Sequence, residues 1–452
     1  MNLAFYAPSI ITKYMIGRIL LLSWPVVGEM ICLVIGGVMT TAMVGRFGAV
    51  EMAAVGLATM LQATCAMVIS AAGTGAGALV ARAYGARRAD EAQRIAGQSL
   101  VIAVTASTLA AAFCYNAGRS LIAAASPDPA VVEMANGFLA VMAFFLPFIA
   151  VTSVCLASIR ATGKTRVSML VAVAGQLISL SVTYTLLFVF KAGVSYAIAG
   201  MASSQALASM ISFLATRSSW TLGLRWRHIY PLRRDIIYGV LKVSSAAGME
   251  QVALQSGRIT FVLLMATAGA VQFAGHNVSL QIESISFMPG MAFGIAAMTL
   301  VGYNLGRGLT HRARQYAWLT CIIGACVMGC CGVVFYFFAE ELTQFFTDDP
   351  QVLAWGIGCM RIAALEQIFL AVDMVLPGVL RGCGDAVTAM YVVIFGTWCF
   401  RIPAILLIKQ LGWFDVVTGW GCAFLDMAIR AVLFVYIVRS KDWGKTKTGI
   451  YV

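Results

Sequence analysis

Twelve long apolar runs follow one another along this chain, and they exclude a water-soluble fold. Each run is long enough to cross the roughly 30 Å hydrocarbon core of a bilayer. They lie near residues 17–44, 52–81, 95–117, 132–157, 167–190 and 194–216, and then near 240–266, 272–301, 315–338, 352–379, 387–408 and 417–438. Only 11% of the residues are charged, too few to cover a soluble chain of 452 residues. Because the runs lack the alternation of a membrane barrel, we predict an all-α membrane protein with twelve transmembrane helices.

The basic residues between these runs predict the orientation in the membrane. Twenty-three Lys and Arg residues fall in the loops and tails of one side, and four fall on the other side. The side rich in Lys and Arg faces the cytoplasm in most membrane proteins. We therefore expect a multi-pass protein of the plasma (inner) membrane with both termini in the cytoplasm. The net charge of +12 is spread over short loops rather than one patch, so we expect no nucleic-acid partner.

The chain contains an internal repeat, in which residues of the second half match those of the first half at one fixed offset. Glu29 pairs with Glu250, and Gly73 pairs with Gly294. Residues 25–92 share fifteen identities with their partners, whereas chance would give roughly six in so apolar a composition. Each half has an even number of spans, so the repeats are parallel, and we predict two six-helix lobes around a central cleft. The predicted domains are an amino-terminal lobe (1–216), a cytoplasmic linker (217–239), and a carboxyl-terminal lobe with a short cytoplasmic tail (240–452).

Several local motifs resemble those of one transporter family. They are Met43-Val-Gly-Arg-Phe-Gly48, Leu79-Val-Ala-Arg-Ala-Tyr-Gly85, Ile282-Glu-Ser-Ile-Ser-Phe-Met-Pro-Gly290, Leu300-Val-Gly-Tyr-Asn-Leu-Gly306 and Leu380-Arg-Gly-Cys-Gly-Asp385. Together they resemble the multidrug and toxic compound extrusion (MATE) family, and within it the bacterial DinF-like branch. The resemblance covers nearly the whole chain. It implies twelve spans in two lobes and export of drugs or metabolites, driven by H⁺ or Na⁺.

The chain departs from the family pattern in the amino-terminal half. The resemblance implies an Asp five residues before Gly45 that helps to bind the coupling cation, but Thr40 stands there. Ser179 and Thr183 stand where asparagines are expected. A hydroxyl group carries no charge near neutral pH. We therefore expect Glu29, Thr40 and Thr183 only as possible lining of the cleft in a lobe that has lost its ionisable centre.

Ionisable residues inside the predicted spans are functional candidates because a charge in a bilayer is costly. The candidates for cation coupling or the substrate cleft are Glu250, Glu283, Glu366, Asp373 and Arg258. The repeat partners of Glu283, Glu366 and Asp373 are not acids, so fold symmetry does not account for these three carboxyl groups. We expect Arg258 to pair with one of them.

Other ionisable residues have a structural alternative. Glu29 and Glu250 occupy equivalent repeat positions, which fits helix packing as well as transport. Asp426 and Arg430 are four residues apart on one helix, so we predict a structural ion pair there. Arg160 and Arg381, each before a glycine turn, are interpreted as anchors of inner loops.

These observations favour a secondary active antiporter that exports amphipathic, cationic drugs or metabolites by alternating access. Acids in the cleft would bind H⁺, or Na⁺ in its place, on one side and release it on the other. The alternatives are a lipid-intermediate flippase with a related two-lobe fold, and a membrane receptor or scaffold without a transport cycle. No Walker A sequence occurs, so we expect that ATP is not the direct energy source. No His-Glu metal spacing occurs either, so we expect no enzyme activity, no cofactor and no bound metal. The expected partners are a small amphipathic molecule, the coupling ion and membrane lipids, around a monomer.

Overall fold

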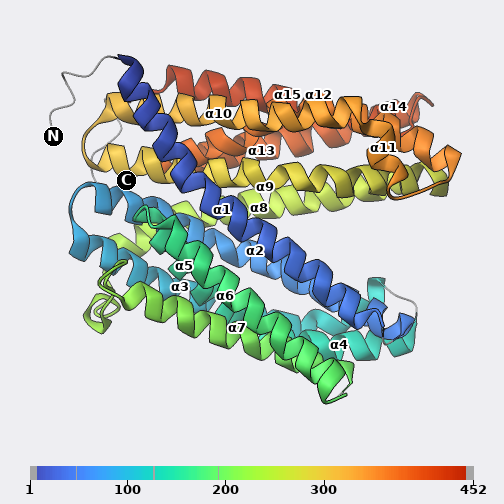
Figure 1. The fold of residues 1–452 in the computed structure, drawn as a ribbon, viewed down its shortest axis with the longest axis horizontal. Helices are drawn as coiled ribbons and strands as arrows, with labels where there is room; N and C mark the ends of the chain where they lie inside the picture. Colours follow the sequence, from blue (N-terminus) through green and yellow to red (C-terminus); the bar gives the residue numbers. More distant parts are fainter. Residues whose placement is uncertain (1–7, 47, 126–127, 192, 444–452) are drawn as a thin grey trace. The chain divides into compact units, whose positions relative to one another are not determined.

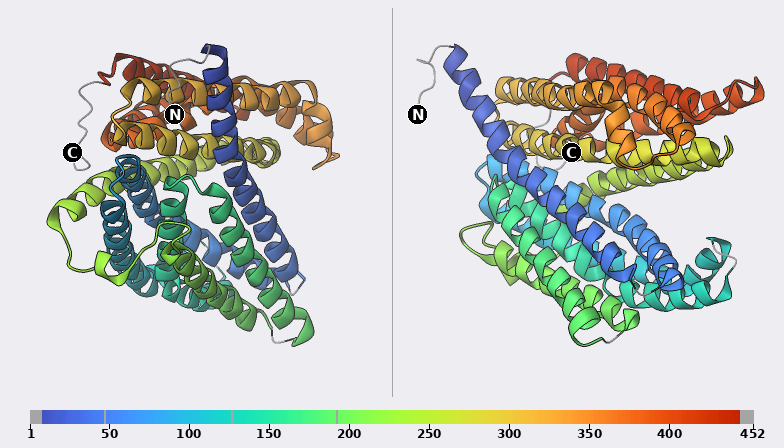
Figure 2. Two further views of the ribbon diagram at one scale, coloured as in Figure 1. Left: turned by 60° about the vertical axis from the view of Figure 1, so that its left-hand side comes forward. Right: turned by 45° about the vertical axis from the view of Figure 1, so that its right-hand side comes forward.

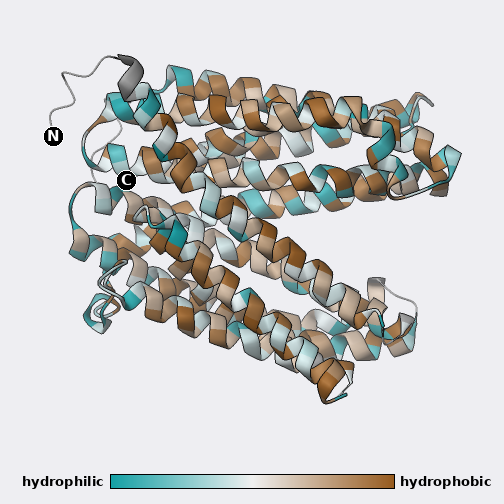
Figure 3. Ribbon diagram, in the orientation of Figure 1, coloured by the Kyte–Doolittle hydropathy of each residue, from teal (hydrophilic) through white to brown (hydrophobic). Residues whose placement is uncertain are grey.

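The computed structural model describes residues 8–443 except 47, 126, 127 and 192. In this part of the chain the regular structure is entirely helical (Figure 1). A chain in hydrocarbon must satisfy its backbone polar groups internally, and consecutive helices achieve this. Polar residues gather at helix ends and loops, and apolar residues dominate along the helices (Figure 3).

The helices confirm every apolar run that the sequence predicts. Their bounds are α1 (Pro8–Val44), α2 (Ala49–Gly85), α3 (Ala89–Ala125), α4 (Pro129–Phe144), α5 (Leu146–Ala161), α6 (Thr165–Tyr184), η2 (Thr185–Val189), α7 (Val194–Arg217), η3 (Trp226–His228), α8 (Arg234–Ala266), α9 (Ala270–Gly306), α10 (Thr310–Phe337), α11 (Ala339–Gln344), α12 (Pro350–Gly382), α13 (Ala386–Ile394), η4 (Phe395–Arg401), α14 (Ile402–Gln410) and α15 (Val416–Ser440). Most helices extend several residues past the apolar run at one or both ends, into the polar loops.

Most of these helices are apolar enough to cross a membrane. Within the described residues, ten helices meet this condition by length and hydropathy, and the bent pair α4–α5 makes eleven if it counts as one span. The one remaining predicted span, near residues 240–266, corresponds to α8, which is 33 residues long but does not meet the hydropathy condition. Glu250 and Arg258 lower its hydropathy. The predicted all-α fold with twelve long helical segments is therefore confirmed.

Helix boundaries repeat at the same offset as the sequence. Helices α2 and α9 begin at Ala49 and Ala270, and α4 and α12 begin at Pro129 and Pro350, so the offset in each pair equals that between Glu29 and Glu250. Both Pro-led helices have an Asp cap, since the Asp128 side chain accepts from the Ala130 N–H and that of Asp349 accepts from the Gln351 N–H, each at 2.9 Å. The two halves thus use the same local devices to begin their helices.

The described chain forms two compact units. The carboxyl-terminal unit contains the chain up to Trp24 together with the chain from Met249 onward, and the amino-terminal unit is Pro25–Gly248. Helices α1 and α8 therefore each contribute residues to both units. The predicted domains at 1–216, 217–239 and 240–452 rest on the count of spans and stay a prediction, and their residues 1–7 and 444–452 lie outside the described chain.

The carboxyl-terminal unit packs around α9, α12 and α15 (Figures 1 and 2). Its core includes Phe293 and Val301 from α9, Val379 from α12 and Phe434 from α15. Ile19 on α1 is fully buried in the same core. The start of α1 is thus an integral part of this unit.

The amino-terminal unit packs α2, α3, α4, α5 and α7 around buried aliphatic residues such as Leu139 and Ile198. The segment predicted as a linker is held against α3. The Gln93 side chain donates to the Leu222 carbonyl at 2.8 Å, and that of Gln98 donates to the Pro231 carbonyl at 3.1 Å. Residues 217–233 therefore pack on this unit.

Candidate coupling site in the carboxyl-terminal unit

Three of the predicted acids lie in one buried cluster with two arginines. Glu283 comes from α9, and Glu366 and Asp373 come from α12. Asp426 and Arg430 on α15 and Arg401 at the end of η4 complete the set. We call these six residues the acid–arginine cluster. Asp426 is fully buried, and the side chains of Arg401 and Arg430 are 12% and 3% exposed.

Ion pairs connect four members of the cluster. Arg401 Nη2 lies 2.8 Å from Asp426 Oδ2, and Arg430 Nη2 lies 3.2 Å from Asp373 Oδ2. Arg430 Nε also lies 3.3 Å from Asp426 Oδ1, which confirms the pair predicted from their spacing. Each buried charge here has a counter-charge, as a low-dielectric interior requires. The pair that the sequence assigned to one helix is one part of a network over three elements.

The remaining two members, Glu283 and Glu366, contact each other. Their carboxyl groups are hydrogen-bonded, and both side chains are buried. An ionised carboxylate only accepts hydrogen bonds, so two carboxyl groups can bond to each other only when one holds a proton. Two ionised carboxylates in contact would also repel each other strongly. This hydrogen bond can therefore exist only while at least one of the two carboxyl groups is protonated.

Small residues allow the helices that carry the cluster to approach. A Cβ atom on Gly378 of α12 would collide with the backbone carbonyl of Gly294 on α9. Gly396 likewise allows η4 to pack closely on α15, because a Cβ there would collide with the side chains of Asp426 and Arg430. Close approach through glycine is a common way to pack membrane helices.

Glu250 and Glu29 form separate ion pairs at equivalent places in the two halves. Glu250 Oε1 lies 2.5 Å from Arg381 Nη2, and Glu29 Oε1 lies 2.7 Å from Arg160 Nη1. Ser168 also donates to Glu29 Oε2 at 3.1 Å. Both pairs span 131 residues. Sequence interpretation assigned the arginines to loop anchoring and missed these partners, although the repeat relates both members of each pair.

The structure does not bring Arg258 into the cluster as an ion-pair partner. Its side chain is exposed on α8, and it makes no ion pair with the described residues. Its charge acts on Glu283 only through space. The expected pairing of Arg258 with a cluster acid is thus not observed, and Arg401 and Arg430 supply the positive charges instead.

Thr40 and Thr183 are held by their own helices. The Thr40 hydroxyl donates to the Gly36 carbonyl at 2.9 Å, and that of Thr183 donates to the Ser179 carbonyl at 2.8 Å. Phe261, the repeat partner of Thr40, lies under the Arg401 guanidinium at 5.6 Å from its ring centre. Within the described residues no group of three or more His, Cys, Asp and Glu side chains is arranged to hold a metal ion.

A helical membrane protein built from two repeats, with a buried network of acids and arginines in one of them, has the construction of a membrane transporter. Comparison with known proteins identifies which kind. The MatE family model matches residues 25–185 and 246–407, and the starts of the two matches are separated by the same offset as Glu29 and Glu250. The chain belongs to the MatE family, and it is a transporter rather than an enzyme.

Two relatives show the extent of the similarity. A probable multidrug resistance protein NorM of Thermotoga maritima is 24% identical over 434 residues, which cover 94% of this chain and 92% of the relative. A multidrug resistance protein MdtK of Edwardsiella ictaluri is 26% identical, over 91% of this chain and 94% of the relative. The family predicted from the motifs is therefore confirmed, while the DinF-like branch stays a prediction.

Solved structures share the fold. A MOP superfamily transporter from Pyrococcus furiosus superimposes with a TM-score of 0.84 at 17% identity, covering 93% of this chain and 94% of the other. An outward-facing multidrug resistance MATE family transporter gives a TM-score of 0.84 at 18% identity, with the same coverage. The alternative of a receptor or scaffold without transport finds no support in these matches.

Proposed function

We propose that this protein is an antiporter that exports amphipathic cationic compounds, with coupling to H⁺ in the carboxyl-terminal unit. The relatives named multidrug resistance proteins support drugs as the exported class. The hydrogen-bonded pair of Glu283 and Glu366 is the observation that carries the choice of ion. Two carboxyl groups in contact release their protons in two steps that belong to the pair rather than to either residue. Na⁺ is the alternative ion, since carboxylate oxygens also bind hard cations.

The charge balance of the cluster supports exchange of a proton for a cationic substrate. Four carboxyl groups face two arginines within the acid–arginine cluster. With both glutamates protonated the cluster is neutral, and each proton released adds one negative charge. The cluster therefore attracts a cation after proton release, and it binds the cation more weakly after proton uptake. Such opposed binding of two ligands is the thermodynamic requirement for coupling.

The test is gradient-driven export from liposomes that contain the purified protein. In Glu283→Gln the new amide can donate to Glu366, so this variant mimics the protonated pair without being able to release its proton. We expect Glu283→Gln and Asp373→Asn to lose uphill export under a pH gradient while they still bind the substrate. Thr40→Ala should do little, because its hydroxyl bonds only to its own helix.

The control is Glu341→Gln, which removes a carboxylate from an exposed position on α11. It should leave export unchanged. Full export by both cluster variants, or loss confined to Thr40→Ala, would return the coupling site to the amino-terminal unit. Export driven by a Na⁺ gradient but not by a pH gradient would replace H⁺ with Na⁺ in the proposal.

The orientation with both termini in the cytoplasm is part of the same proposal. The loop charges place Thr347 on the outer side of the membrane and Ser219 on the cytoplasmic side. In a background without native Cys, a Cys at Thr347 should react with an impermeant thiol reagent added to intact cells, and a Cys at Ser219 should not. Labelling of only the Ser219 position would reverse the orientation.

A further inference from the structure

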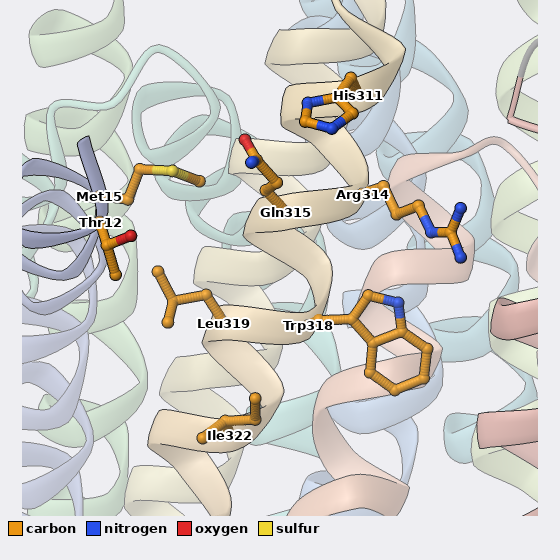
Figure 4. A pocket seen from close by; sticks show the side chains of 8 residues that line it. All are labelled: Thr12, Met15, His311, Arg314, Gln315, Trp318, Leu319 and Ile322. Carbon is orange, nitrogen blue, oxygen red and sulfur yellow. The ribbon is translucent and has the colours of Figure 1, made fainter. Parts of the chain in front are cut away.

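A surface groove between α1 and α10 combines an apolar floor with a basic end. It has a volume of about 420 Å³ and lies within the carboxyl-terminal unit. Figure 4 shows Met15 on α1 facing Gln315, Leu319 and Ile322 on α10, with His311 near the start of that helix. The groove is also lined by Thr12 on α1 and by Arg314 and Trp318, which project from the other flank of α10.

The groove begins where both helices enter the apolar part of the chain. The membrane-spanning stretches of α1 and α10 start at Thr12 and Thr310. His311 and Arg314 therefore lie near the level of the lipid headgroups. From His311 to Ile322 the helix rises about 16 Å, close to the roughly 15 Å depth of one leaflet. The dimensions fit an acyl chain that lies along α10.

The basic end of the groove has no acidic partner in the described chain. Arg314 is exposed, and neither Arg314 nor His311 takes part in an ion pair there. The loop charges predict that this end faces the cytoplasm, where leaflets carry anionic lipids. We infer that this groove binds one anionic phospholipid, with its phosphate on Arg314 and His311 and an acyl chain on Met15, Leu319 and Ile322.

The repeat supplies an internal comparison. A second groove, of about 290 Å³, lies between α3 and α8 in the amino-terminal unit, at the position related to the first by the repeat. Val101 lines it at the position equivalent to Ile322. No charged residue lines this second groove. The repeat partner of His311 is Asp90, an acid that lies outside the lining of the second groove and contacts His228 at 3.2 Å. The second groove therefore offers no positive charge to an anion.

The experiment measures lipid retention by the full-length protein in detergent, using native mass spectrometry with added phosphatidylglycerol or phosphatidylethanolamine. We expect one phosphatidylglycerol molecule to be retained in preference to phosphatidylethanolamine, and thermal unfolding to shift upward with that lipid only. Arg314→Gln should weaken the affinity about fivefold, the effect of one basic residue at an anionic surface. Ile322→Trp fills the groove and should remove the preference altogether.

Two matched controls separate this site from general attraction. Arg312→Gln removes the same charge from the same helix outside the groove, and Val101→Trp fills the equivalent place in the second groove; both should retain the lipid. Glycerol phosphate, which has the phosphate without the chain, should not compete. Equal binding of the two lipids, equal effects of Arg312→Gln and Arg314→Gln, or competition by glycerol phosphate would each overturn the proposal.

Discussion

The repeat-related ion pairs give the sharpest test of which acids are structural. In Glu29→Gln and Glu250→Gln, one partner of a nearly buried pair loses its charge while the shape of the side chain is kept. Breaking a buried pair costs about 3–5 kcal/mol because the remaining charge is left uncompensated. Arg160 and Arg381 are 14% and 19% exposed, so water screens part of that charge. We expect a loss of about 2–3 kcal/mol in the free energy of unfolding in each variant.

The assay is thermal unfolding of the purified variants in detergent. For a folding unit of about 200 residues, this loss corresponds to a decrease in melting temperature of about 5–10 °C. The decreases in melting temperature of Glu29→Gln and Glu250→Gln should agree within a factor of two. In each double variant, with Arg160→Gln or Arg381→Gln added, the loss of unfolding free energy should be smaller than the sum of the losses in the two single variants, because no charge is left unpaired.

Transport distinguishes a structural pair from a coupling residue. If both pairs only hold helices together, the folded fraction of each variant should still export substrate under a gradient. Loss of export in Glu250→Gln at an unchanged melting temperature, with Glu29→Gln fully active, would refute this reasoning. Glu250 would then belong to the coupling site despite its pairing with Arg381.

Two further changes test the packing and the polar ends of the carboxyl-terminal unit. Gly396→Ala should lower stability by about 1–3 kcal/mol, since its Cβ would collide with the Asp426 side chain; Gly421→Ala on α15, where a Cβ meets no atom within 4 Å, should be nearly neutral in the same unfolding assay. Burial alone would raise the pKa of Asp385, but the hydrogen bond from Lys441 helps to lower it overall. The native state therefore favours ionised Asp385, so the stability lost in Asp385→Asn should be constant above about pH 5 and should shrink only as the pH falls below about 4.

Much of the fold could be predicted because a bilayer allows few solutions. An apolar run of sufficient length must be a helix, so every run from 17–44 to 417–438 lies in a helical segment. The offset between Glu29 and Glu250 also holds for the helix boundaries. These features depend on composition and local order, which a sequence displays directly.

The site was less accessible because it depends on helix rotation and on contacts between distant segments. Arg401 meets Asp426 only because η4 packs closely on α15 through a glycine. An apolar helix has no polar face that indicates its rotation, so the sequence analysis expected Arg258 as the partner and did not identify Arg401. The Glu250–Arg381 pair was predictable in principle, since the same offset relates both of its residues to Glu29 and Arg160.

The comparison of the two halves separates scaffold from chemistry. Devices present in both halves, such as the Asp caps at Asp128 and Asp349 and the two Glu–Arg pairs, begin helices and fasten their ends. The carboxyl pair of Glu283 and Glu366 occurs in one half alone. A buried network of charges is costly, and the amino-terminal half forms the same fold without one. A charge network retained in one repeat and absent from its partner is therefore the part of this molecule least explained by folding, and the part in which ion coupling should be sought.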